Sequence, residues 1–112
     1  MIRFKDSSVQ FGNCAQINLG LIVVDQVITE LAPGYDTIIT SNREQNGKHR
    51  YTSLHWDERA VDIRSKHLPD DAVKRKVQAE VKRRLTIDWD FILEGLGTDN
   101  EHFHLEWQPK RR

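Results

Sequence analysis

The sequence predicts an α+β fold, in which a small antiparallel sheet has two main helices packed on one side of it. Three observations lead to this prediction. Two long segments repeat apolar residues at helical spacing, and several short segments alternate polar and apolar residues or are rich in β-branched residues. The chain has 112 residues, of which 38% are hydrophobic, and this suits a single domain, 1–112, with a modest core.

The first helix is expected over residues 15–31, where apolar residues recur at steps of three and four. Asn13 is the expected N-cap. Pro33 and Gly34 are expected to end the helix, because proline has no amide hydrogen and glycine accepts the left-handed conformation. The apolar residues of this segment are Ile17, Leu19, Leu21, Ile22, Val24, Val27, Ile28 and Leu31.

Two strands joined by a long polar loop are expected next. Residues 37–40 are β-branched and lie between turn formers. Residues 59–63 alternate polar and apolar side chains, which is typical of a half-buried strand. The polar segment 41–52 between them is therefore expected to be a loop.

The second helix is expected over residues 70–85, where four apolar residues follow one another at four-residue steps. Two further strands, 89–93 and 102–107, flank a segment rich in turn residues and are expected to form a hairpin. The last five residues are polar and are expected to fray.

The charge balance argues against some classes of partner. Seventeen Lys and Arg balance seventeen Asp and Glu, so no overall field favours nucleic acid or an anionic membrane. The single cysteine, Cys14, excludes an internal disulfide, which leaves a bound metal as a means of reinforcing a small core. No segment approaches the ~20 apolar residues of a membrane span, and no signal-peptide pattern is present. We expect a monomer that is cytoplasmic at synthesis and binds neither nucleic acid nor membrane.

Candidate metal ligands lie in or beside the expected strands. His102 and His104 are separated by one residue, so a strand places both side chains on the same face. A hydrolytic zinc centre needs about three protein ligands and a carboxylate that takes a proton from water. His55 and Asp62 can complete the ligand set, and Glu101 can supply the carboxylate. Each of these residues also has an ordinary interpretation, as an exposed strand residue, a solvated acid or a member of a surface ion pair.

Two motifs resemble those of a metallopeptidase superfamily. Residues 53–62 read Ser-Leu-His-Trp-Asp-Glu-Arg-Ala-Val-Asp and resemble the S-x-H-x-x-G-x-A-x-D motif of the D-alanyl-D-alanine and VanY-like metallopeptidases. Residues 101–104 read Glu-His-Phe-His and resemble the E-x-x-H motif of the same enzymes. The superfamily also holds the phage L-alanyl-D-glutamate endolysins and the hedgehog signalling domain, whose form of the first motif is especially similar to residues 53–63.

The resemblance implies a hedgehog/D-Ala-D-Ala-peptidase-like zinc fold and a role for each motif residue. Glu101 would act as general base and then as general acid, and His102 would lie beside the metal and stabilise the oxyanion. Arg43 would hold a carbonyl or carboxylate of the substrate. The implied Zn²⁺ ligands are His55, Asp62 and His104.

The function implied by the resemblance is zinc-dependent hydrolysis of peptidoglycan stem peptides. The enzyme would be an L-Ala-D-Glu endopeptidase or a D-Ala-D-Ala carboxypeptidase. The absence of a signal peptide and of a wall-binding module suits a phage or prophage lysis enzyme that a separate pore releases to the cell wall.

Two other functions stay open on the sequence. Glu58 stands where the motif has Gly, and a non-glycine residue is strained wherever a positive φ is needed. This favours a non-catalytic zinc-binding module of the same fold. The second alternative is a small interaction protein without metal, in which the histidine-rich strand is incidental.

Overall fold

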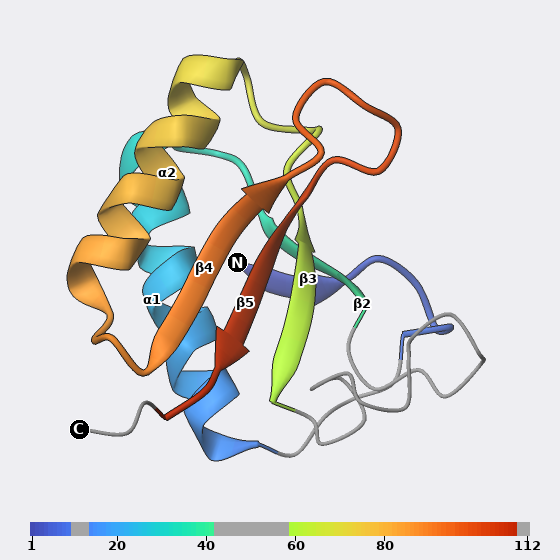
Figure 1. Ribbon diagram of the computed structural model, residues 1–112. Helices are drawn as coiled ribbons and strands as arrows, with labels where there is room; N and C mark the ends of the chain where they lie inside the picture. The colour runs from blue at the N-terminus through green and yellow to red at the C-terminus, as the bar shows by residue number, and fades with distance from the viewer. Residues whose placement is uncertain (10–13, 42–58, 110–112) are drawn as a thin grey trace.

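The computed structural model describes residues 1–9, 14–41 and 59–109. Within these residues, five strands and two helices form an α+β domain (Figure 1), which confirms the predicted α+β class. Within the described ranges, no helix is long and apolar enough to cross a membrane. In chain order the elements are β1 (Ile2–Phe4), α1 (Ala15–Leu31), β2 (Thr37–Ser41), β3 (Ala60–Arg64), α2 (Asp71–Arg84), β4 (Trp89–Glu94) and β5 (His102–Trp107).

The sheet is mixed, with the strand order β1-β2-β3-β5-β4. The predicted antiparallel arrangement holds for β2 to β5 and is wrong for β1, which pairs in parallel with β2. The reason lies in the connection between the two strands. The chain returns from β1 to β2 through α1, and such a helical crossover brings the second strand back in the same direction as the first.

The helices begin and end close to the predicted residues. The N-cap of α1 is Cys14, without a side-chain hydrogen bond, whereas the predicted cap Asn13 lies outside the described residues. Gly34 follows the end of α1 with a φ of 91°, as expected for a helix stop. Asp70 caps α2 by accepting a hydrogen bond of 2.8 Å from the backbone N–H of Val73.

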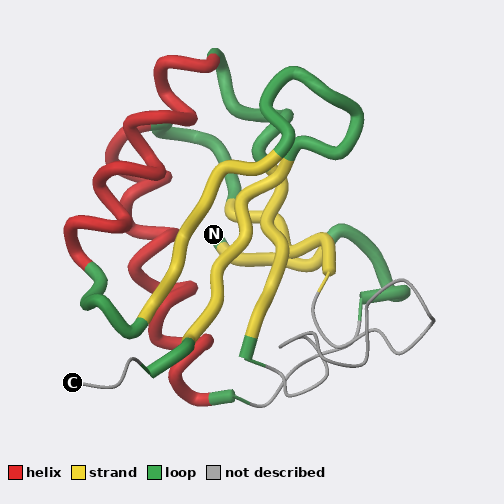
Figure 2. Tube along the Cα trace, in the orientation of Figure 1, coloured by secondary structure: helices red, strands yellow, loops and turns green. Residues whose placement is uncertain are grey.

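The core lies between the helices and one face of the sheet (Figure 2), as predicted. Phe91 of β4 and Phe103 of β5 are fully buried and stack with their ring centroids 5.0 Å apart. Because side chains alternate along a strand, the residues between the core positions point to the opposite face of the sheet. The other large core residues are Val24, Val27 and Ile28 of α1, Val77 and Val81 of α2, and Val61, Ile63 and Leu105 of the sheet.

Candidate metal site

Polar side chains of β3 and β5 gather on the sheet face opposite the helices, which we call the outer face. Phe103 points into the core, so His102 and His104 on either side of it belong to the outer face. Strand β3 pairs antiparallel with β5, and the register sets Asp62 directly opposite His104. The period of two and this register together bring three potential ligands to one place.

Asp62, His102 and His104 form a cluster that we call the metal-site group, and their donor atoms lie within 4.8 Å of one another. Oδ1 of Asp62 is 2.8 Å from Nδ1 of His104 and 3.7 Å from Nε2 of His102. At ordinary zinc bond lengths, neighbouring ligand atoms of a tetrahedral site are about 3.4 Å apart, and the two distances lie on either side of this value. One carboxylate oxygen and two imidazole nitrogens are also donors that zinc prefers. The group can therefore hold a metal ion.

His104 is held by a second carboxylate. Its Nε2 lies 2.9 Å from Oε1 of Glu106, on the side of the ring away from Asp62. Burial alone would lower the pKa of His104, but the hydrogen bonds and charges of Asp62 and Glu106 outweigh it and raise the pKa to about 9. The metal-free side chain is thus protonated at neutral pH and donates from both nitrogens. A metal at Nδ1 would replace one proton and leave Nε2–H donating to Glu106, which is the usual support of a metal-bound histidine.

The structure brings together three of the predicted site residues and leaves others untested. Asp62, His102 and His104 form the group described above. The predicted ligand His55 and the predicted substrate-binding residue Arg43 both lie outside the described residues, as does Glu58 at the motif's glycine position.

Glu101 directly precedes β5 and is only 7% exposed. Its carboxylate accepts hydrogen bonds from Ser65 Oγ and from the backbone N–H of Gly97, and it forms an ion pair of 3.0 Å with Nζ of Lys74 on α2. Burial would raise the pKa of Glu101, but these donors together lower it. Both carboxylate oxygens are therefore occupied by donors of the protein, and the role of Glu101 as a general base stays a prediction.

Two carboxylates of the outer face, Glu106 and Glu94, are not among the site residues predicted from the sequence. Continuing the alternation of His102 and His104 by one step reaches Glu106, so the spacing contained a signal for this residue. Glu94 lies opposite His102 across the β4–β5 pairing, with Oε1 3.7 Å from Nε2 of His102. No spacing in the sequence indicates Glu94, because the seven-residue connection between the strands sets which residues face each other.

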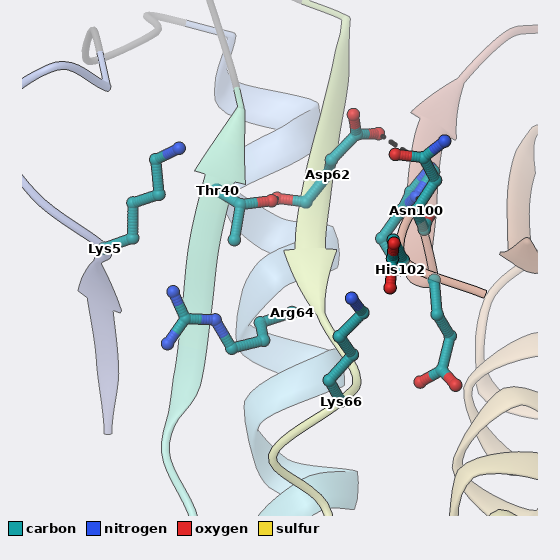
Figure 3. A pocket seen from close by; sticks show the side chains of 9 residues that line it. Lys5, Thr40, Asp62, Arg64, Lys66, Asn100 and His102 are labelled. Atoms are coloured by element: carbon teal, nitrogen blue, oxygen red, sulfur yellow. Dashed lines mark hydrogen bonds and ion pairs between the residues drawn. The ribbon is translucent and has the colours of Figure 1, made fainter. Parts of the chain in front are cut away.

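A pocket of about 620 Å³ adjoins the metal-site group (Figure 3). Asp62 and His102 belong to the metal-site group and also line the pocket, so a molecule in the pocket lies against two of the potential ligands. The other lining residues are Lys5, Thr40, Arg64, Lys66, Asp99, Asn100 and Glu101.

No family model matches the chain, and a search of curated proteins finds no match. The function proposed below rests on the geometry of the outer face and on the two sequence motifs.

Proposed function

We propose that the protein is a zinc-dependent peptidase that hydrolyses peptide bonds of peptidoglycan stem peptides, at L-Ala-D-Glu or D-Ala-D-Ala bonds. The observation that carries this proposal is the pairing of Asp62 with His104, with Glu106 behind the imidazole and a pocket alongside. The resemblance of residues 53–62 and 101–104 to metallopeptidase motifs supports the same chemistry and supplies the substrate class.

Asp62 and His104 are ligands in both versions of the proposed site. The third ligand is His55 according to the motif and His102 according to the described geometry. Where His55 is the ligand, His102 is placed beside the metal and donates a hydrogen bond to the developing oxyanion. When bound, zinc supplies Lewis acidity, which polarises a peptide carbonyl and makes water more acidic.

Proton transfer requires a carboxylate within reach of the reacting water. The motif assigns this role to Glu101, whose oxygens are engaged by Lys74, Ser65 and Gly97. Glu94 is the half-exposed carboxylate beside His102 on the outer face. Glu101 and Glu94 are thus competing candidates for proton transfer, and replacing each one in turn shows which of them is required.

The test is a mass-spectrometric digest of purified peptidoglycan by zinc-loaded protein, with zinc content measured in parallel. New peptide ends from the wild type, lost together with zinc in H104A, support a metallopeptidase and identify the bond. H67A serves as the matched control, because Nε2 of His67 bonds the backbone carbonyl of Asp36 away from the site. Whichever of H55A and H102A loses zinc identifies the third ligand. A wild type that binds no zinc would refute the proposal.

A second candidate is a non-catalytic zinc-binding module on the same scaffold. The buried ion pair of Glu101 with Lys74 and the glutamate at position 58 favour it. Metal would then stabilise the fold, since binding energy at such a site adds to folding free energy. Bound zinc without new peptide ends is the result expected for this candidate. Chelation lowers the melting temperature in either case, so the digest and not the melting curve separates the two.

A further inference from the structure

The side of α2 that faces away from the sheet is basic. Helix α2 contains six Lys and Arg but only two acids. Because Val77 and Val81 are buried in the core, the positions on the opposite side of the helix face solvent. Three exposed cations of α2 form no ion pair within the described residues: Arg75, Lys76 and Lys82.

The two acids of α2 contact other cations of the same helix. Asp71 lies in the first turn, 3.4 Å from the buried ammonium group of Lys74. Glu80 is half-buried and pairs with both Arg83 and Arg84. The unpaired charge on the solvent side of α2 is therefore positive.

The neighbouring helix exposes large aliphatic side chains. Helices α1 and α2 lie side by side on one face of the sheet (Figure 1), and Arg84 of α2 pairs with Glu30 of α1. Leu19 and Ile22 are one helical turn apart on the side of α1 away from the core, and they are 61% and 49% exposed. The aliphatic and basic side chains together form a surface that we call the helix-layer patch: Leu19, Ile22, Arg75, Lys76 and Lys82.

The opposite side of the molecule carries mainly negative charge. At the outward positions of β3, β4 and β5, Arg64 is the one cation, against four acids: Asp62, Asp90, Glu94 and Glu106. The formal net charge of zero thus averages over two unlike faces. Because attraction to a charged surface depends on how the charges are distributed, the zero net charge does not exclude an anionic partner for the helix layer.

We propose that the helix-layer patch binds the surface of an anionic lipid bilayer. Lys and Arg side chains are attracted to anionic headgroups, and aliphatic side chains beside them enter the boundary between headgroups and acyl chains. A nucleic acid would contact the cations and leave Leu19 and Ile22 in water. A second copy of the chain would cover the aliphatic groups but would bring like charges together. The bilayer surface is the partner that suits both halves of the patch.

A bilayer bound at the helix layer leaves the metal-site group accessible. The helices and the outer face lie on opposite sides of the sheet, so the outer face then points away from the lipid and toward water. This inference goes beyond the proposed peptidase function and does not depend on it, since none of the patch residues belongs to the metal-site group.

The test is co-sedimentation of the protein with phosphatidylcholine vesicles, prepared with and without phosphatidylglycerol. Binding is expected to require the anionic lipid and to weaken with added salt. The double variant K76Q/K82Q should bind about thirtyfold more weakly, at about fivefold for each cation. The double variant L19Q/I22Q should bind about tenfold more weakly, because its side chains no longer favour the apolar part of the bilayer.

Two matched controls change exposed residues outside the patch. K66Q removes a lysine from the turn after β3, and I92Q removes an isoleucine that is 45% exposed on the outer face. Both controls should bind vesicles as the wild type does. The measurements are repeated on chelated protein, so that the result does not depend on metal.

Equal binding to vesicles with and without phosphatidylglycerol would overturn the proposal, as would a loss of binding in K66Q or I92Q as large as in the patch variants. Tighter binding of duplex DNA than of anionic vesicles would overturn it in favour of a nucleic acid. A dimer in sedimentation equilibrium that L19Q/I22Q dissociates, without vesicle binding, would overturn it in favour of a second copy. Vesicle binding without peptidoglycan cleavage removes the peptidase alone, and cleavage without vesicle binding removes the bilayer surface alone.

Discussion

Replacement of Glu101 with Gln separates a structural carboxylate from a catalytic one. The side chain is buried, and its charge is balanced by Lys74 of α2 at 3.0 Å. Gln is nearly the same shape but has one acceptor oxygen and an NH₂ donor in place of two acceptor oxygens, so the change removes the negative charge and one hydrogen-bond acceptor. The substitution leaves the ammonium group of Lys74, only 9% exposed, without its buried partner.

The expected loss of unfolding free energy is about 3 kcal/mol. Removing one member of a buried ion pair typically costs about 3–5 kcal/mol, because the other charge is left uncompensated. The lower end applies here, since Lys74 keeps a second partner, Asp71, at 3.4 Å. For a domain of about this size, this corresponds to a fall in melting temperature of roughly 12 °C.

Urea denaturation of E101Q, K74M and the double variant measures this cost. The double variant removes both charges and should lose less stability than the sum of the single variants. E94Q is the matched control, because Glu94 is half-exposed and its substitution should change stability by less than about 0.5 kcal/mol. An E101Q protein as stable as the wild type would refute the structural role.

Zinc content and peptidoglycan cleavage are measured on the same variants. The motif predicts that E101Q retains zinc and loses cleavage. Cleavage retained by folded E101Q and lost in E94Q would instead assign proton transfer to Glu94. Loss of zinc in E101Q would count against a role confined to proton transfer.

Three further predictions concern stability. F103A should lose about 3–5 kcal/mol in urea denaturation, since the ring is fully buried and stacks on Phe91; a loss below 1 kcal/mol would contradict the core described here. D70A should lose about 1 kcal/mol, because the N-cap acceptor for Val73 is removed, and an unchanged midpoint would contradict that cap. In metal-free protein, the raised pKa of His104 stabilises the fold fully below pH 6.5, and this contribution should fall away as the pH rises through about 9. Denaturation at pH 6, 8 and 9.5 measures this loss of stability, and H104Q should not show it.

Much of the secondary structure could be predicted because it follows from local spacing. The first helix matches its predicted range, and the second lies within one residue of its predicted range at each end. The hairpin of β4 and β5 also follows from short-range turn signals. Strand β1 has only three residues, all exposed, and no pattern distinguishes it. It exists through its pairing with β2, more than thirty residues away, and therefore depends on tertiary structure.

The candidate site is likewise determined in part by the sequence and in part by the tertiary structure. That His102 and His104 share a face is determined by the sequence, because successive side chains of any strand alternate. That Asp62 meets His104, and that Lys5, Arg64 and Lys66 line one pocket, is decided by strand register and by the order of strands in the sheet. The motif places Glu101 three residues before His104, but only the packing of α2 pairs it with Lys74. Spacing along the chain determines the direction of a side chain, whereas its partners come from segments that only the folded core brings together.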